Sequence, residues 1–346
     1  MAIIMKYGRL TDNIYERSVV KVVKRNSDKN RKFYEGAGLG ADCALFHCKD
    51  DKTINKSLVS GQAMAHGKDI NVVLRAYVSA INNAIVKGGV KDLYANITIM
   101  VPERLREIKI RQMLEKVVTN AEITGVPVLG ADVNVIPAVG EIIANCVVSG
   151  LVYDEDIVSC KASVGDDIVM TKWIGLEGTV MLANNYYEEL CTKYHRDIVD
   201  GAKSFEQYLS VATEASIAKE QGASAVQVIR SGGVFGALWE LGENNKAGLI
   251  INLNKIPVKQ ETVEICEYFD INPYELLSGG GLLVTTSDSG KMIYELEKHG
   301  ISATVIGTIT DGNDRCIRHD DEMRYLEPAK GDEIYKILQR EGVVTV

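Results

Sequence analysis

The chain has 346 residues, more than one hydrophobic core usually contains, so two domains are expected. A formal net charge of −8 argues against a nucleic-acid-binding protein, because phosphate backbones are bound through a basic face. No apolar stretch reaches the roughly 18 to 20 residues that cross a membrane, and the first residues lack the pattern of a signal peptide. These features predict a cytoplasmic protein that binds neither nucleic acid nor membrane.

The cysteines predict neither a disulfide framework nor a zinc site. Seven are present, an odd number, and none belongs to a Cys-x-x-Cys pair. Cys43 and Cys48 bracket His47, but residues 43 and 48 of a strand point to opposite faces, which argues against a metal cluster there.

The first half of the chain alternates predicted strands and helices in a β-α-β-α-β pattern. The helix at 69–87 is the clearest, because its apolar residues recur on one face and Gly88-Gly89 follows as a stop signal. In chain order we expect a helix at 11–26, strands at 43–48 and 57–60, a helix at 69–87, a strand at 93–101, a helix at 103–124 and a strand at 142–152. An acidic junction follows, and we place the domain boundary there, giving domains of residues 1–160 and 161–346.

The second half also mixes strands with covering helices. It contains neither a Walker loop nor a Rossmann glycine fingerprint, so no standard nucleotide-binding fold is predicted. We expect strands at 167–171, 247–253, 282–286 and 303–308, a helical stretch ending near Glu189, and helices at 204–220, 234–242, 260–268 and 289–298. The fold class is therefore α/β, with α+β character, in two domains.

A glycine-rich loop before the strand at 43–48 carries the strongest local signal. Gly36, Gly38 and Gly40 alternate with other residues, and Asp42 follows them. Glycines let the backbone approach a phosphate closely, and consecutive amides form an anion nest. A carboxylate just after such a loop suits Mg²⁺, which prefers oxygen ligands. The loop predicts phosphate binding by the glycines and metal binding by Asp42; the alternative is a flexible turn before an edge strand.

Two further polar positions are candidate metal ligands. Asp132 follows Gly130-Ala131 at the carboxyl end of a predicted strand, where ligands commonly bind, so it is expected to share a metal ion with Asp42. Asn83 lies next to Asn82 near the end of the helix at 69–87, and its carbonyl oxygen is a neutral Mg²⁺ ligand. The alternatives are a turn aspartate bonded to its own backbone and two solvent-facing amides.

Two glycine clusters in the second half complete the candidate site. Arg230, Gly232 and Gly233 precede a predicted helix, whose first amides are a natural phosphate site. Gly279 and Gly280 lie in a Ser-Gly-Gly-Gly run before a predicted strand. Phosphate binding is the functional interpretation of both clusters, and close packing of a helix on a sheet is the alternative. A guanidinium at Arg230 is also suited to hold a phosphate through two bonds.

The order of these motifs resembles the AIR synthase superfamily, which includes thiamine-monophosphate kinase, selenophosphate synthetase and the hydrogenase-maturation dehydratase, hydrogenase expression/formation protein E. The chain looks nearest the last of these. The stretches that carry the resemblance are Tyr7-Gly-Arg-Leu10, Gly36-Ala-Gly-Leu-Gly40-Ala-Asp42, Ser163-Val-Gly-Asp-Asp-Ile-Val-Met-Thr171, the region from Gly232 to Pro257, and Ile306-Gly-Thr308. Together they span nearly the whole chain, and their joint order is more specific than any single motif.

The resemblance implies two α/β domains and a homodimer. In such proteins the N-terminal domains carry a mixed sheet with helices, and the sheets of two subunits build a shared barrel. Active members bind ATP and Mg²⁺ in a cleft near that interface, and phosphorylate an oxygen atom or cleave ATP to drive a dehydration. The resemblance therefore implies ATP and Mg²⁺ as cofactors, and a small phosphorylated molecule as ligand.

The sequence also departs from the family at its acidic positions. Asp42 and Asp132 match two of the family's carboxylates, whereas Gly61, Asn83 and Val228 fall where the family has an aspartate, the last in a motif that here contains Arg230. Metal ions positioned by such ligands supply most of the catalysis of phosphoryl transfer. The family's Pro-Arg-x-Cys tail has no counterpart at the end of this sequence, so we do not expect full hydrogenase-maturation activity.

Two hypotheses about function remain open. The first, which the missing carboxylates favour, is a protein that binds ATP or another phosphorylated ligand with little turnover. The second is an active ATP-dependent kinase, ligase or dehydratase whose Mg²⁺ ligands are rearranged. Hydrolysis of ATP in the presence of Mg²⁺ distinguishes them.

Overall fold

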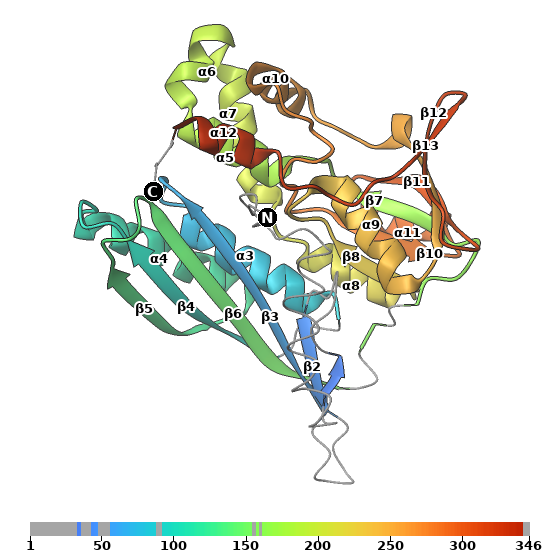
Figure 1. Ribbon diagram of the computed structural model, residues 1–346. Coiled ribbons are helices and arrows are strands. Elements are labelled where there is room, and N and C mark those ends of the chain that lie inside the picture. Colours follow the sequence, from blue (N-terminus) through green and yellow to red (C-terminus); the bar gives the residue numbers. More distant parts are fainter. Residues whose placement is uncertain are drawn as a thin grey trace, which may run out of the picture. The chain divides into compact units, whose positions relative to one another are not determined.

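The computed structural model of the chain describes residues 33–35, 43–47, 56–87, 92–153, 157–158 and 161–341 (Figure 1). The predicted helix at 11–26 and the predicted loop of Gly36, Gly38, Gly40 and Asp42 lie outside these ranges. The described residues form two compact units, one ending at Val158 and the other containing residues 161–341. Each unit is an α/β structure built on its own sheet, which confirms the predicted fold class.

The first unit is built on a six-stranded sheet with the strand order β1-β2-β3-β6-β4-β5. Its central pair, β3 and β6, is antiparallel along twelve residues, from Lys56 opposite Tyr153 to Gly67 opposite Ile142. Within this sheet, β4 and β5 are the one described pair that runs parallel, because helix α4 returns the chain between them. The strands are β1 (Phe33–Glu35), β2 (Cys43–His47), β3 (Lys56–Gly67), β4 (Leu93–Val101), β5 (Val128–Val135) and β6 (Ile142–Tyr153).

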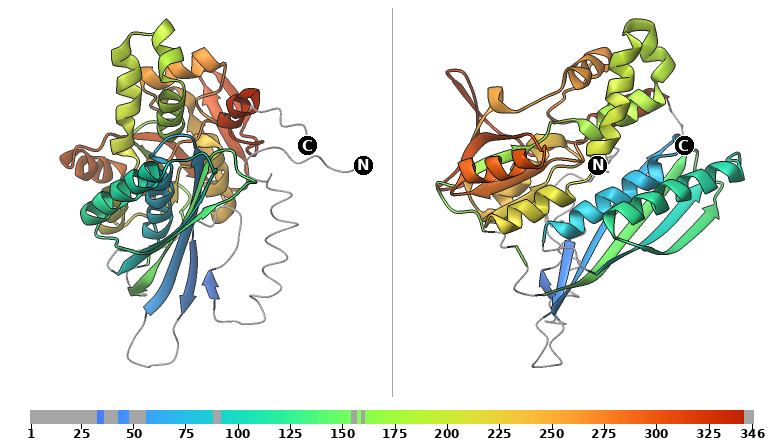
Figure 2. Two further views of the ribbon diagram at one scale, coloured as in Figure 1. Left: turned by 90° about the vertical axis from the view of Figure 1, so that its left-hand side faces the viewer. Right: turned by 180° about the vertical axis from the view of Figure 1, so that it is seen from behind.

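Two helices, α3 (Val72–Ile85) and α4 (Glu107–Thr124), cover one face of this sheet (Figures 1 and 2). Strand β4 alternates buried and more exposed residues, so its buried set, Leu93 and every second residue after it, faces the helices. Nearly all of α3 is buried, as its apolar periodicity predicts. Helix α4 ends at Gly125, whose positive φ of 68° completes a left-handed cap.

Strand β3 lies directly against the backbone of α3 at Gly61. A Cβ atom on Gly61 would lie 2.8 Å from the Ala84 nitrogen and 2.9 Å from the Ala80 carbonyl oxygen. Real Cβ atoms do not approach backbone atoms this closely, so only glycine fits between the strand and the helix here.

The second unit is built on a seven-stranded mixed sheet with the order β13-β12-β9-β11-β7-β10-β8. The pair β9–β12 is parallel, and the other neighbouring pairs are antiparallel. The strands are β7 (Asp167–Thr171), β8 (Ala225–Val228), β9 (Gly248–Asn252), β10 (Leu282–Thr286), β11 (Ala303–Thr310), β12 (Arg315–His319) and β13 (Glu322–Tyr325).

The helices of this unit contribute to two buried clusters. One cluster packs α9 (Gly233–Asn245) on the sheet, and the other joins α5 (Leu176–Asn185), α7 (Arg196–Ser204), α10 (Gln260–Phe269) and α12 (Ile334–Glu341). The remaining helical segments are α6 (Tyr187–Lys193), η4 (Phe205–Tyr208), α8 (Ala212–Glu220), η5 (Leu253–Lys255) and α11 (Ser289–Lys298). No helix in the described ranges is long and apolar enough to cross a membrane.

The predicted continuous helix at 204–220 was wrong. The chain forms the end of α7, the single turn η4 and then α8, with a break at residues 209–211. At this break the carbonyl groups of Tyr208 and Ser210 both accept hydrogen bonds from the Lys172 ammonium group, so they do not continue a helix. Apolar periodicity could not reveal the break, because its cause is a lysine more than thirty residues away.

We predict that Gly61→Ala lowers the free energy of unfolding by about 1 to 3 kcal/mol, because the added methyl group forces β3 away from the α3 backbone. The matched control is Gln62→Ala, the next residue of the strand, which is exposed and should change stability by less than about 0.5 kcal/mol. Urea unfolding of both variants measures the effect. Equal midpoints for the two variants would contradict the close approach.

Candidate functional site

In the first unit, the two described candidate metal ligands have different surroundings. Asp132 lies exposed on β5, and its Oδ2 atom accepts a hydrogen bond of 2.8 Å from the Asn134 side chain. Asn83 is buried on α3, and its Nδ2 atom donates to the Gln62 carbonyl oxygen at 2.9 Å. Asn83 therefore already fastens α3 to strand β3, whereas Asp132 has its carboxylate in solvent.

The fold of a single chain does not bring Asp132 and Asn83 together. Strand β5 is separated from β3 by β4 and β6, three strand spacings or about 14 Å at 4.8 Å each. The Asn96 side chain lies on the face of the sheet away from the helices, and a Cβ on Gly130 would contact it, so Gly130 has that face as well. Asp132, two residues further along β5, points to the same face. Asn83 lies on a helix that covers the opposite face, so one metal ion cannot contact both residues of one chain.

A third acidic residue, Asp69, is held by a buried arginine. Its carboxylate accepts two hydrogen bonds from the Arg75 guanidinium, at 2.7 and 3.1 Å, and one from the Asn71 amide at 2.7 Å. Arg75 is only 1% exposed, so separating this pair would leave a buried cation without its counter-ion. Asp69 is therefore a structural partner of Arg75 and is not available to replace a missing metal ligand.

In the second unit, the glycines at the start of α9 are required by the backbone. Gly232 and Gly233 have positive φ angles of 83° and 65°, which glycine adopts without strain. A Cβ on Gly233 would lie 2.2 Å from the Tyr274 carbonyl oxygen. The ring of the same Tyr274 stacks on that of Phe235, with the ring centroids 5.1 Å apart. Close packing, one of the two interpretations of this motif, is thus sufficient to explain Gly233.

The amide of Gly232 is occupied by a carboxylate of the same chain. Asp332 is buried, and its Oδ2 atom accepts a 2.8 Å hydrogen bond from the Gly232 amide. Its Oδ1 atom accepts bonds of 3.0 Å from the amides of Leu277 and Ile334. Burial raises the pKa of the Asp332 carboxyl, and the hydrogen bonds from these amides and from the Ser231 side chain oppose that rise.

The guanidinium of Arg230 is also paired with a carboxylate. Its Nη2 atom lies 3.0 Å from Oε2 of Glu240, which is 4% exposed and accepts a second bond from Gln227. A phosphate at Arg230 would have to share this cation with Glu240.

The Ser278–Gly281 loop packs against a third carboxylate. A Cβ on Gly279 would lie 2.2 Å from Oε2 of the buried Glu177, so the glycine is needed to admit that side chain. The loop is also held by Ser278, whose hydroxyl oxygen accepts a 2.6 Å hydrogen bond from the Gly175 amide. Gly280 has a φ of 107° and directs its carbonyl oxygen to the Lys172 ammonium group at 2.9 Å.

Lys172 is the centre of a buried network that holds this loop. Its Nζ atom donates to the carbonyl oxygens of Tyr208, Ser210 and Gly280 at 2.6 to 2.9 Å, and pairs with Glu214 at 2.5 Å. Burial lowers the pKa of Lys172, and the Glu214 carboxylate counters that shift. Lys172 also has a positive φ of 57°, a strained conformation that its four contacts sustain.

Three of the five candidate phosphate contacts in this unit therefore lie against an acidic side chain: Arg230 against Glu240, Gly232 against Asp332, and Gly279 against Glu177. A phosphate placed beside these carboxylates would be repelled unless a cation lay between them or a carboxylate moved away. No local pattern in the sequence predicts these partners, because each lies at least ten residues from the residue that it contacts.

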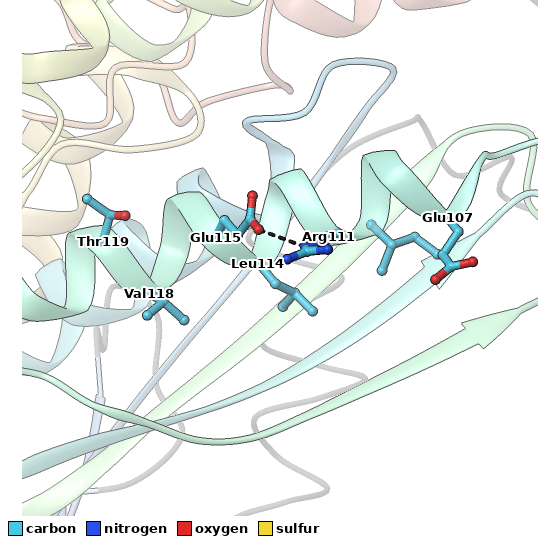
Figure 3. Close-up of a pocket in the computed structure, with 7 residues that line it drawn as sticks. Glu107, Arg111, Leu114, Glu115, Val118 and Thr119 are labelled. Atoms are coloured by element: carbon cyan, nitrogen blue, oxygen red, sulfur yellow. Dashed lines mark hydrogen bonds and ion pairs between the residues drawn. The ribbon is translucent and has the colours of Figure 1, made fainter.

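A shallow hollow of about 590 Å³ lies on the first unit, away from all these residues (Figure 3). Its described lining comes from one helix, α4, and includes the apolar side chains of Ile110, Leu114 and Val118. Arg111 and Glu115 form a 2.8 Å ion pair along this helix. It contains none of the candidate site residues, and its wide opening and single wall do not suit a small-molecule site.

Comparison with known proteins identifies a family domain. Residues 163–319 match the family described as AIR synthase related protein, C-terminal domain. A putative hydrogenase expression/formation protein of Methanocaldococcus jannaschii is 24% identical over 241 residues, covering 68% of this chain and 70% of the relative. The carbamoyl dehydratase HypE of Rhizobium leguminosarum is 22% identical over 242 residues, covering 67% of this chain and 66% of the relative.

Solved structures share the fold over almost the whole chain. A HypE–HypF complex aligns with a TM-score of 0.68 at 19% identity, covering 90% of this chain and 99% of the other. AaThiL complexed with AMPPCP and TMP also gives 0.68, at 17% identity, covering 95% and 99%. HypE in complex with ATP gives 0.65 at 16% identity, covering 94% and 96%. The AIR-synthase-like fold predicted from the sequence is thus confirmed.

We predict that Lys172→Met lowers the free energy of unfolding by about 3 to 5 kcal/mol, because it leaves the buried Glu214 carboxylate without its counter-ion. Lys246→Met is the matched control, since Lys246 also has a positive φ, of 50°, but is exposed. Denaturant unfolding compares the two variants, and adding Glu214→Gln to Lys172→Met should recover part of the loss. A Lys172→Met variant as stable as the control would show that the Lys172 network contributes nothing to the free energy of unfolding.

Proposed function

We propose that this chain is a member of the AIR synthase-related superfamily, that it binds ATP or another phosphorylated ligand together with Mg²⁺, and that its catalytic turnover is weak. The observation that carries the proposal is the family match over residues 163–319. Two proteins of the same fold bound to ATP or to AMPPCP support the choice of a nucleotide as first ligand to test.

The scarcity of carboxylates at the described candidate positions supports weak turnover. No group of three or more His, Cys, Asp or Glu side chains that could hold a metal ion occurs among the described residues. Gly61 has no room for a carboxylate beside α3, and Asn83 is neutral and bonded to Gln62. Asp132 is thus the one described candidate ligand that brings charge, and a triphosphate with Mg²⁺ needs several such ligands for efficient transfer.

The second candidate is an active ATP-dependent kinase, ligase or dehydratase with rearranged Mg²⁺ ligands. The exposed carboxylate of Asp132 favours it, because this residue keeps a metal-binding group free in solvent on the first unit. Steady release of phosphate from ATP that needs Mg²⁺ and disappears in Asp132→Asn would support this candidate over binding alone.

We further propose that two copies of the chain associate through the uncovered face of the first sheet, in the cytoplasm. This face exposes large apolar side chains, including Met64 at 66%, Tyr153 at 48% and Tyr94 at 42% exposure. A second copy packed on this face would remove these side chains from solvent.

The test of the proposal is thermal unfolding with ATP, ADP and AMP, each with and without Mg²⁺. A ligand at about 100 times its Kd stabilises the folded state by roughly 2.7 kcal/mol, and for domains of this size that raises the Tm by about 5 to 10 °C. We expect such a rise with ATP and Mg²⁺ together. An unchanged Tm with every nucleotide would reject nucleotide binding.

Asp132→Asn should remove most of the Mg²⁺-dependent part of this rise in Tm, because it deletes the one charged metal ligand described. The Tm without ligand should stay the same, since Asp132 is exposed. Asp321→Asn, an exposed aspartate in the turn between β12 and β13, is the control and should respond to ATP as the wild type does. An unchanged Mg²⁺ response in Asp132→Asn would remove Asp132 from the site.

A further inference from the structure

The segment from Leu326 to Ile334, here called the C-terminal strap, crosses the turn that begins α9. Leu326 is buried in the core under the sheet and Ile334 in the core between the helices, so both ends are anchored. Between them, Ala329 lies against Gly232, whose added Cβ would come within 3.0 Å of the Ala329 methyl group. The strap follows residue 319, where the match to the family domain ends.

Asp332 gives the strap a charged contact with this turn. Its two carboxylate oxygens are bound by a set of donors, here called the amide cradle: the amides of Gly232, Leu277 and Ile334, at 2.8 to 3.0 Å, and the Ser231 side chain. Two of these amides, of Gly232 and Leu277, belong to loops 45 residues apart in the sequence, so the cradle is built by the tertiary fold.

The cradle has the chemistry of an oxyanion site that is already filled. Converging backbone amides bind phosphate and carboxylate oxygens alike, because both present negatively charged acceptors to the same donors. The Gly232 amide has one hydrogen to donate and gives it to Asp332. An external phosphate therefore reaches this amide only if the carboxylate leaves.

The middle of the strap is exposed at Glu327, Pro328 and Lys330, and the Glu327–Lys330 ion pair joins two residues within the strap itself. Outside the cradle, the Leu326 amide donates a 2.8 Å hydrogen bond to the Arg315 carbonyl oxygen, and the Glu333 carboxylate accepts a 3.1 Å bond from the Asn272 amide. Glu333 and Ile334 are buried, so an external phosphate that displaces Asp332 also disturbs these neighbours.

We propose that Asp332 is an internal ligand that competes with an external phosphate for the amide cradle, so that the C-terminal strap restrains phosphate binding at Gly232. This inference rests on the proposed function, because it takes Gly232 to be a phosphate contact. Beyond the proposed function, the Asp332 carboxylate would limit phosphate binding at Gly232. Removing this carboxylate should therefore strengthen phosphate binding.

The test is calorimetric titration of the full chain with inorganic phosphate. Asp332→Ala should bind phosphate about tenfold or more tightly than the wild type, because an emptied cradle offers charge-assisted hydrogen bonds that no longer have to be taken from Asp332. Asp321→Ala removes the same charge at an exposed turn and should keep the wild-type affinity. A folded Asp332→Ala variant with the wild-type affinity would overturn the proposal.

A second variant and a second measurement guard against loss of folding. Asp332→Asn keeps the volume of the side chain and should give a smaller gain in phosphate affinity than Asp332→Ala. If neither variant folds, hydrogen exchange of the wild type decides: saturating phosphate should raise exchange in residues 326–334 and lower it in residues 231–236. Unchanged exchange in the strap at saturating phosphate contradicts competition.

These outcomes separate the two proposals. Nucleotide binding fails if ATP leaves the Tm of the wild type unchanged, with or without Mg²⁺. The competing role of Asp332 fails if phosphate affinity does not rise in the variants, whatever the wild type does with ATP.

Discussion

The ammonium group of Lys172 is the interaction on which the second unit most depends. It joins the end of β7, the break between η4 and α8, and the glycine loop before β10, segments that are distant in the sequence. A buried charge costs several kcal/mol unless it is paired and fully hydrogen-bonded. Three carbonyl groups and Glu214 meet that requirement, and they fix the course of three loops at once.

Two other polar features of this unit are bound by carboxylates of the same chain. Glu240 neutralises Arg230, and Asp332 occupies the amide of Gly232, so the two features most suited to an anion are bound to acids of the same chain. The first unit shows the opposite condition, because Asp132 stands in solvent with an asparagine as its described partner. The balance of charge therefore differs between the units, and each candidate ligand group must be judged by what already contacts it.

The sequence was sufficient for the fold because periodicity and turn residues act locally. The helix predicted at 69–87 contains α3, and the helix predicted at 103–124 contains α4, which Gly125 ends with a left-handed cap. The candidate site was only partly predictable. Glycines mark a backbone that must turn or pack closely, but Gly61, Gly233 and Gly279 do so against α3, Tyr274 and Glu177, respectively. A pattern of glycines cannot distinguish such packing from phosphate binding, since the partner comes from a distant part of the chain.

Strand β5 ends the first sheet, and among the strands that the structure describes none pairs with its outer edge. Such an edge presents backbone groups that readily pair with another polypeptide. Here the edge carries Asp132 and Asn134 side by side, and its register with β4 is shifted by an irregularity next to Asn96. A negative charge and an irregular start are features that discourage further strands from adding to an edge, and Asp132 brings such a charge to this one.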